Sequence, residues 1–378
     1  MNRISRIVAA GTVAAITLGG ALAANADDMN GMGMNRHNAY TINLLVSDLQ
    51  GATVQDPNLK NAWGVAFSPA GSPFWINDNA TGLATLYNGD GSIVPLVVTI
   101  PCPPSPGQGS SCPANASPTG IVWNPSSAFR VPGTKIQAAF IFDTEDGTIS
   151  AWAPGLTPAT NAVLAVDNSQ TGPGAVYKGL AFGVNVHGAF LFATNFRAGT
   201  IDVFNTQYQP AQTDGGFTDP DIPPGFAPFG IQSIDGDLFV TYAKQNAQRH
   251  DDVAGPGNGF VDVFDTDGHL LRRLASGGKL NSPWGVARAS FAFGRFSGDI
   301  LIGNFGDGRI NALPMDGGPM TQLRGTDGKP IAIDGLWTLT LGGGAKSSPD
   351  TLYFTAGPNG ETDGLFGTIT PMGRHRDQ

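Results

Sequence analysis

The chain of 378 residues has little charge, few cysteines and no recognised catalytic motif. Asp, Glu, Lys and Arg make up 13% of the residues, about half the usual share. The 30 acidic residues outnumber the 21 basic ones, and the formal net charge is −9. Because nucleic-acid binding needs Lys and Arg to neutralise phosphates, we expect no nucleic-acid partner. The Gly-x-Ser-x-Gly elbow of serine hydrolases is also absent, so no motif indicates a reaction.

Long hydrophobic runs are missing too, except for one at the N-terminus. Two arginines precede an apolar run over residues 7–22, and the small-x-small sequence at residues 24–26 is typical of a signal-peptidase site. A membrane-anchored helix is the alternative, but the run is too short for one. We therefore predict a signal peptide over residues 1–26, a disordered mature N-terminus over residues 27–38, and a secreted or periplasmic protein without a membrane anchor.

The two cysteines, Cys102 and Cys112, lie in one segment rich in Pro, Gly and Ser. In an oxidising compartment, pairing is the default for such cysteines. Metal ligation is the alternative, but no His or further Cys lies nearby in the sequence. We predict a Cys102–Cys112 disulfide that closes a surface loop, and the loop-entropy model gives it about 2–3 kcal/mol of stabilisation.

Glycine and proline, in contrast, are abundant, with 53 and 28 residues. Both resist helix formation and favour turns, which argues against a helical protein. Hydrophobic residues make up 41% of the chain, including 22 Phe and 6 Trp, and can form a large core. The composition therefore predicts a globular, turn-rich protein.

One pattern of strands recurs six times. Each repeat has a first strand that contains a glycine, then a second and a third strand rich in β-branched and aromatic residues, with polar turns between them. The spacing of roughly 50–60 residues is typical of a repeat architecture. We expect the first strands at residues 61–67, 118–123, 177–182, 228–232, 282–287 and 334–339.

The sixth repeat ends without a fourth strand, whereas the first five each have one. Residues 40–48 form an apolar strand ahead of the first repeat and can supply the missing one. Pairing the N-terminal strand with the last repeat closes the ring and hides the sheet edges. We therefore predict an all-β, six-bladed β-propeller over residues 39–371, a polar tail over residues 372–378, and a monomer.

These repeats carry a family resemblance. First strands such as Trp63-Gly64-Val65-Ala66, and third strands that follow an Asp-Gly turn, resemble those of NHL-repeat propellers. Residues 63–67, 244–253 and 304–311 more closely resemble an uncharacterised family of exported bacterial six-bladed β-propeller proteins. This resemblance spans residues 39–371 and implies the fold and a signal peptide, but no activity.

Polar side chains recur in the loops that precede the first strand and follow the second strand of the repeats. In a four-stranded antiparallel blade these loops reach the same face of the propeller. Turn formation alone explains many Asn, Asp and Gly residues in such loops. The alternative is a funnel that holds a polar ligand or a cation, because hard cations take oxygen ligands from separate loops.

On the second interpretation we predict ligand-binding residues along the propeller axis, namely Asn61, Asp78, Lys178, Asn195 and Asn304. The predicted metal set is Asp78, Glu145, Asn195 and Asn304, with calcium as the candidate ion.

The loop of the fourth repeat, residues 244–259, is longer than its counterparts and carries several charges. Long loops on a rigid scaffold often carry function, although a solvated loop held by its own ion pairs is the alternative. An imidazole beside two carboxylates can act as a general base or as a metal ligand. We therefore add to the predicted ligand site Lys244, Arg249, His250, Asp251 and Asp252, and we name His250 and Glu145 as candidate catalytic residues.

These observations leave two functions open. The first is a binding or scaffold protein that uses the loop face at the axis to hold a small polar ligand or an extracellular protein partner. The second is a metal-assisted hydrolase or lactonase, since calcium-dependent six-bladed lactonases are similar in fold. Only the second requires a bound metal.

Overall fold

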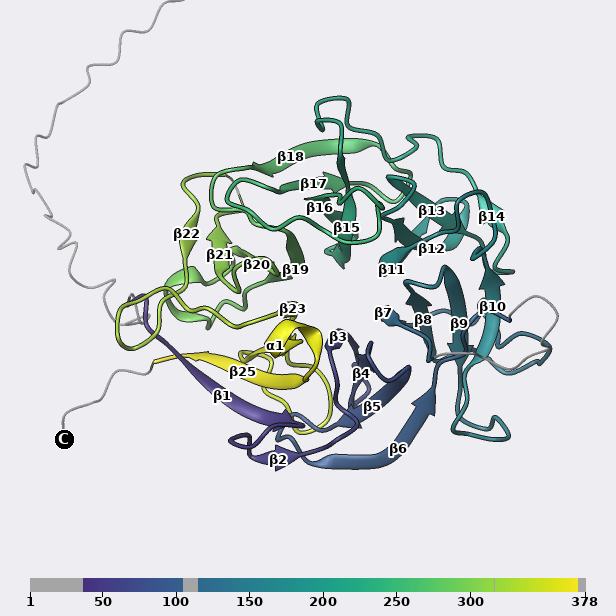
Figure 1. The fold of residues 1–378 in the computed structure, drawn as a ribbon, viewed down its shortest axis with the longest axis horizontal. Coiled ribbons are helices and arrows are strands. Elements are labelled where there is room, and N and C mark those ends of the chain that lie inside the picture. The colour runs from purple at the N-terminus through teal and green to yellow at the C-terminus, as the bar shows by residue number, and fades with distance from the viewer. Residues whose placement is uncertain (1–36, 105–114, 316, 373–378) are drawn as a thin grey trace, which may run out of the picture. The chain divides into compact units, whose positions relative to one another are not determined.

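The computed structural model describes residues 37–104, 115–315 and 317–372, and these form six β-sheets arranged around an axis (Figure 1). This arrangement confirms the predicted six-bladed β-propeller. The expected signal peptide and Cys112 lie outside the described residues, so export and the Cys102–Cys112 disulfide stay predictions. Two helical turns, η1 (Gly294–Phe296) and α1 (Pro358–Glu361), accompany the strands. Neither helix in this part of the chain is long enough to cross a membrane.

In each of the first five blades, four consecutive strands form an antiparallel sheet. Blade 1 contains β3 (Ala62–Ala66), β4 (Phe74–Asp78), β5 (Leu83–Tyr87) and β6 (Ile93–Thr99). Blade 2 contains β7 (Pro118–Trp123), β8 (Phe140–Thr144), β9 (Thr148–Trp152) and β10 (Val163–Asp167). Blade 3 contains β11 (Tyr177–Asn185), β12 (Gly188–Asn195), β13 (Thr200–Phe204) and β14 (Pro210–Ala211).

Blades 4 and 5 follow the same plan, with the first strand innermost, whereas blade 6 is a five-stranded sheet whose two outermost strands are parallel. Blade 4 contains β15 (Phe226–Ile234), β16 (Asp237–Lys244), β17 (Phe260–Phe264) and β18 (Leu270–Ser276). Blade 5 contains β19 (Pro283–Arg288), β20 (Ile300–Asn304), β21 (Ile310–Leu313) and β22 (Thr321–Gln322). Blade 6 contains β23 (Leu336–Leu341), β24 (Leu352–Ala356), β25 (Leu365–Pro371), β1 (Tyr40–Ser47) and β2 (Val54–Gln55).

The ring closes through the N-terminal strand, as the sequence predicts. Strand β1 pairs antiparallel with β25, from Tyr40 opposite Pro371 to Ser47 opposite Leu365 (Figure 1). Tyr40 is buried, and its hydroxyl donates a hydrogen bond to the Phe293 carbonyl of blade 5. This closure therefore ties the start of the propeller both to blade 6 and to the neighbouring blade.

All six innermost strands share one irregularity, in which two residues lie opposite a single residue of the second strand. In blade 1, for example, Ala62 pairs with Asp78 and Val65 with Ile76, so Trp63 and Gly64 both face Asn77. Such a β-bulge bends the strand and re-aims its side chains. The first bulge residue of each blade is, in order, Trp63, Thr119, Lys178, Phe229, Trp284 and Trp337.

The second bulge residue is glycine in blades 1 to 5 because the backbones of neighbouring blades approach closely there. A Cβ atom on Gly64 would lie 2.3 Å from the Thr119 carbonyl oxygen, and one on Gly230 would lie 2.3 Å from the Trp284 carbonyl oxygen. In blade 6 the position is Thr338, whose hydroxyl donates a hydrogen bond of 2.7 Å to the Trp63 carbonyl.

In five of the six blades, the side chain opposite a bulge bonds to these buried backbone groups, whereas blade 5 has Gly303 at that position. Asn77 donates to the Thr119 carbonyl at 3.1 Å, and Thr194 donates to the Phe229 carbonyl at 2.7 Å, in each case across to the next blade. Asp143 holds the same position in blade 2, where its Oδ1 accepts hydrogen bonds and its buried Oδ2 has no hydrogen-bond partner within residues 37–104, 115–315 and 317–372. Burial raises the pKa of Asp143 to about 7, so a neutral carboxyl is favoured there.

The close approach at the bulge predicts a large effect of a single methyl group. We expect Gly230→Ala to lower the free energy of unfolding by about 1–3 kcal/mol, because the new Cβ overlaps a backbone oxygen of the next blade. The matched control is Gly325→Ala, where the nearest atom is the exposed Asp327 side-chain oxygen at 3.1 Å. Urea unfolding of both variants measures the difference, and equal stabilities would contradict close packing at the bulge.

Asp143 gives a second prediction, on pH. Its folded-state pKa of about 7 lies above the ordinary value of 3.8, so its contribution to stability is present below pH 4 and is lost as the pH rises toward 7. We therefore expect Asp143→Asn to gain stability relative to the wild type between pH 4 and 7, by an amount on the order of 4 kcal/mol. Unfolding curves at several pH values test this, with Asp350→Asn, in an exposed loop, as the control. A pH-independent difference would show that Asp143 is ionised in the fold.

Candidate functional site

The side chains of the first bulge residues meet at the propeller axis. The Trp63 ring lies 3.8 Å from that of Trp337 and 6.3 Å from that of Trp284, between ring centroids. Phe229 of blade 4 lies 5.9 Å from Trp337 of blade 6. Two of these contacts, Trp63 with Trp284 and Phe229 with Trp337, join non-adjacent blades, so they identify the axis. They form a buried aromatic layer across it, with Phe196, Ala227 and Ala243 in the same cluster.

A second layer lies beside this one and is formed by the residues that follow the second strands. The backbone N–H groups of Asn79, Glu145, Phe196 and Phe305 each donate to the residue that enters the first strand of their own blade. This shared hydrogen bond places them equivalently at the mouth of the axis where the first strands begin. The side chain at this position is polar in blades 1 and 2 and in blade 4, where it is Gln245, and it is apolar in blades 3 and 5.

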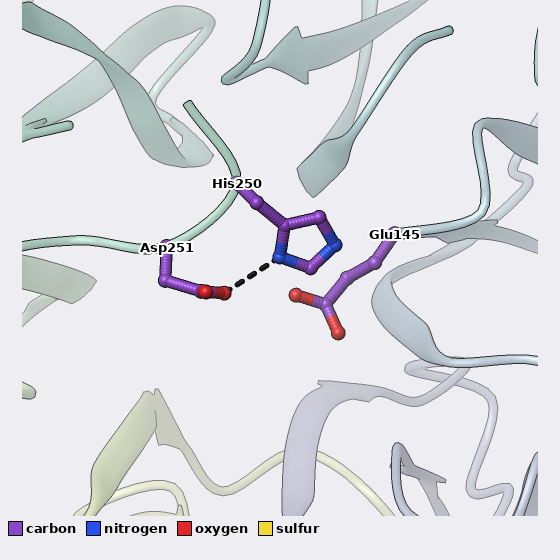
Figure 2. Close-up of side chains that lie close together, drawn as sticks. All are labelled: Glu145, His250 and Asp251. Carbon is purple, nitrogen blue, oxygen red and sulfur yellow. Dashed lines mark hydrogen bonds and ion pairs between the residues drawn. The ribbon is translucent and has the colours of Figure 1, made fainter. Parts of the chain in front are cut away.

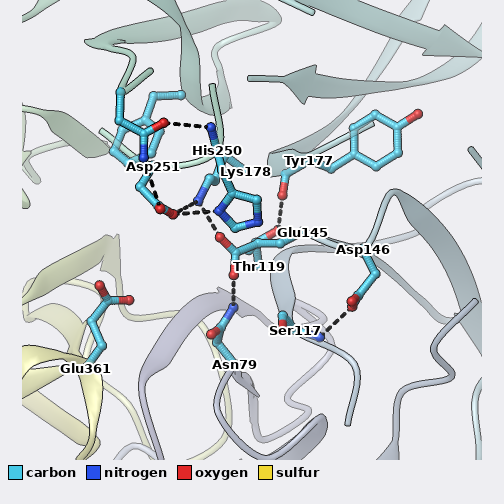
Figure 3. A network of polar contacts seen from close by, with 12 residues as sticks. Asn79, Ser117, Thr119, Glu145, Asp146, Tyr177, Lys178, His250, Asp251 and Glu361 are labelled. Atoms are coloured by element: carbon cyan, nitrogen blue, oxygen red, sulfur yellow. Dashed lines mark hydrogen bonds and ion pairs between the residues drawn. The ribbon is translucent and has the colours of Figure 1, made fainter. Parts of the chain in front are cut away.

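Glu145 and Lys178 form the central ion pair of this mouth (Figure 3). The Lys178 side chain is only 3% exposed, and its ammonium donates to Glu145 Oε1 and lies 5.2 Å from the centre of the Trp63 ring. Asn79 Nδ2 donates to Glu145 Oε2 at 3.0 Å. A buried ammonium needs a paired carboxylate and benefits from an aromatic face, and this site provides both.

The long loop of blade 4 adds His250 and Asp251 to this ion pair. Asp251 Oδ1 lies 3.6 Å from the Lys178 ammonium and 2.7 Å from His250 Nδ1. The hydrogen bond from His250 lowers the pKa of Asp251 to about 2. Figure 2 shows the imidazole between the two carboxylates, and ligand atoms of Glu145, His250 and Asp251 all lie within 4.8 Å of one another.

Backbone hydrogen bonds fold this loop over the axis. Asn246 N–H donates to the Asp251 carbonyl and Val253 N–H to the Lys244 carbonyl, both at 2.8 Å. The loop is also attached to blade 5, because Gly255 N–H donates to Asn281 Oδ1 at 2.6 Å. The Lys244 and Arg249 side chains are exposed and make no ion pair with the described residues. The sequence predicted five ligand residues in this loop. The fold brings two of them, His250 and Asp251, into the ion-pair network of Glu145 and Lys178.

Two further carboxylates face the same mouth. Asn61 donates to Glu361 Oε2 at 2.8 Å and to Asn79 Oδ1 at 3.1 Å, and its own Oδ1 accepts a hydrogen bond from Trp337. Burial raises the pKa of Glu361, and the charge of Glu145 raises it further. Burial also raises the pKa of Asp252, whose Oδ2 has no hydrogen-bond partner among the described residues.

The other predicted ligands lie elsewhere. Asn195 donates to Asp202 at 2.9 Å and Asn304 donates to Asp307 at 3.0 Å, each within its own blade. Asp78 is fully buried, and desolvation raises its pKa well above the ordinary range. These three residues occupy the strand position just before that of Glu145, and successive side chains of a strand point to opposite sides. The structure therefore does not bring the predicted metal set of Asp78, Glu145, Asn195 and Asn304 together.

Asn79 and Glu361 belong to the mouth but were not predicted from the sequence as site residues. Asn79 of blade 1 is equivalent to Glu145 of blade 2, because each residue directly follows the second strand of its blade. Alignment of the repeats on their bulge glycines could therefore have identified Asn79. Glu361 lies in the turn α1 with φ of 68°, a conformation that ordinary side chains rarely adopt. No repeat pattern indicates that position.

Comparisons with solved structures support the fold. The aldose sugar dehydrogenase of Escherichia coli superimposes with a TM-score of 0.52 at 12% identity, covering 88% of this chain and 100% of the enzyme. A luciferin-regenerating enzyme gives 0.50 at 11% identity, covering 84% of this chain and 93% of that protein. Similarity at this level of identity shows a shared propeller architecture and no more.

Sequence comparison identifies relatives of unknown activity. No family model matches the chain. The uncharacterised protein R648 of Acanthamoeba polyphaga mimivirus is 32% identical over 339 residues, which cover 87% of this chain and 80% of that protein. The uncharacterised protein L690 of the same virus is 31% identical over 341 residues, with 87% and 85% covered. The chain therefore belongs to one family with these two mimivirus proteins, and the family has the six-bladed propeller fold described above.

Proposed function

We propose that this protein is a binding propeller that holds a small polar ligand at the axial mouth formed by Glu145, Lys178, His250, Asp251 and Glu361, referred to below as the carboxylate mouth. This proposal rests on one observation, namely that these residues come from different blades. They come from blades 2, 3, 4 and 6, and Asn61 and Asn79 of blade 1 connect them by hydrogen bonds. A site built from five blades exists only in the assembled ring.

Turn formation does not account for this network. A turn-forming Asn or Asp bonds to backbone amides a few residues away in its own loop, as Asp307 does with Arg309 N–H. The contacts of the carboxylate mouth instead join side chains that are distant in sequence, such as Asn79 to Glu145 and Lys178 to Asp251. Such contacts support a site rather than a set of independent turns.

The charges of the mouth favour a ligand that donates hydrogen bonds. Four carboxyl groups, Glu145, Asp251, Asp252 and Glu361, surround the single ammonium of Lys178, so acceptors outnumber donors. Half-buried Phe305, whose ring lies 4.0 Å from that of Trp337, offers an apolar surface beside them. A hydroxyl-rich or amine-bearing small molecule matches this combination of carboxylates and an aromatic face.

A metal-assisted hydrolase is the second candidate, and Glu145, His250 and Asp251 favour it. Their ligand atoms lie close enough together to hold one ion, provided that Lys178 leaves Glu145. A site with an imidazole and two carboxylates suits zinc or manganese better than the calcium expected from the sequence, because calcium prefers oxygen ligands alone. When bound, such an ion would polarise a carbonyl group or lower the pKa of a water molecule. His250 and Glu145 would serve as ligands, so neither would be free to act as the base.

The test uses two variants of exposed residues, His250→Ala and Asp251→Asn. We expect a thermal-shift panel of monosaccharides, sugar lactones, polyols and primary amines to give at least one ligand, with affinity reduced about 10- to 100-fold in Asp251→Asn, because a hydrogen bond to a charged group is lost. Since His250 and Asp251 are 37% and 61% exposed, the melting temperatures should change little. Lys244→Ala, at the start of the same loop and outside the network, is the control.

Metal analysis of the purified protein separates the two candidates. Stoichiometric zinc or manganese that is lost in His250→Ala, together with hydrolysis of a lactone, would favour the hydrolase. Equal affinity of the wild type and Asp251→Asn for every ligand would contradict binding at the carboxylate mouth.

A further inference from the structure

The axis has a second mouth, at the end where the innermost strands finish. There the structure contains a cavity of about 290 Å³, lined by residues beyond the bulges in blades 1, 2, 3, 4 and 6. We call it the exit cavity. The innermost strands all run in the same direction along the axis, so the buried aromatic layer of Trp63, Phe229, Trp284 and Trp337 lies between the exit cavity and the carboxylate mouth. The chemistry of the exit cavity is set by six side chains, namely Phe67, Trp123, Phe182, Gln232, Ser233 and Thr340.

Small side chains leave this space open. The position two residues beyond the bulge glycine is alanine in blades 1, 3 and 5, at Ala66, Ala181 and Ala287. These alanines are buried in the hydrophobic clusters of the blades, so they do not extend across the axis as the tryptophans do one layer away. A separate, smaller cavity of about 140 Å³ shares Gln232 and Thr340 with the exit cavity and is also lined by Arg288, which does not line the exit cavity.

We infer that the exit cavity is a second ligand site, for a small uncharged molecule with a flat ring and one hydrogen-bonding group. Its volume is close to the lower end of the roughly 300–1,000 Å³ of typical ligand pockets, which matches a ligand of one or two rings. No Asp, Glu, Lys, Arg or His lines it among the described residues, so a charged ligand would lose its hydration without a partner. The net charge of −9 also disfavours anions.

The polar and aromatic groups of the exit cavity fit such a ligand. Phe67, Trp123 and Phe182 supply flat apolar faces from three neighbouring blades. The exposed Gln232 amide and the Ser233 hydroxyl make no side-chain hydrogen bond with the described residues, so they can bind one polar group of a ligand. Aromatic side chains together with a few convergent polar groups are features of small-molecule sites.

The test is a titration of the full chain with N-phenyl-1-naphthylamine, a neutral two-ring probe with one N–H group whose fluorescence rises in apolar surroundings. We expect saturable binding of one probe per chain, and at least tenfold weaker binding to Gln232→Trp. Gln232 is exposed and lines the exit cavity, so the larger tryptophan side chain can occupy the cavity without displacing the core. Thr340→Phe, in blade 6, is a second variant that fills the cavity with a larger side chain. It replaces Gln232→Trp in the test if circular dichroism shows that Gln232→Trp does not fold.

The control is Val186→Ser, a residue 90% exposed in the turn between β11 and β12 and outside the exit cavity. Its affinity for the probe should equal that of the wild type. Unchanged binding in the folded filling variants, a loss of binding in Val186→Ser, or the absence of saturable binding would each overturn the inference. The Asp251→Asn variant should retain the probe, because the carboxylate mouth lies on the other side of the aromatic layer.

Discussion

The close approach of neighbouring innermost strands at the β-bulge is the constraint on which this structure depends. The glycine of one bulge packs against the backbone of the next, as Gly64 does against Thr119 and Gly285 against Trp337. A side chain in place of these glycines would contact the backbone of the next blade, and the repetition of this close approach explains why the glycine recurs in five repeats. The same bulge turns the preceding residue toward the axis, so one backbone feature fixes both the spacing of the blades and the residues that meet at the centre.

The chemistry of the axis then depends on the residues that occupy a few equivalent positions. At the first bulge position, aromatic residues of blades 1, 4, 5 and 6 form a buried layer, whereas blade 3 places Lys178 there. A buried ammonium is costly unless it is paired, and Glu145 of the adjacent blade supplies the partner. The polar part of the mouth is therefore concentrated on blades 1 to 3, and the long loop of blade 4 completes it.

The aromatic layer also separates two ends of different character. Carboxylates and amides gather where the innermost strands begin, while alanines and exposed Gln232 surround an uncharged cavity where these strands end. Both ends are formed by the same six strands, so their difference arises from side chains alone. A propeller can in this way present two chemically distinct ends without any change in its backbone plan.

The sequence alone determined the number of blades, their order and the closure by residues 40–48, because strand periodicity and recurrent glycines are local signals that repeat. It also identified Glu145, Lys178, His250 and Asp251 as candidates. Only the tertiary structure decided which polar residues meet. Asp78 and Asn79 are adjacent in sequence, yet Asp78 is buried inside blade 1 and Asn79 bonds to Glu145, since successive side chains of a strand point to opposite sides. Glu361 reaches the mouth through a turn that no other repeat shares, so its position depends on contacts between distant parts of the chain.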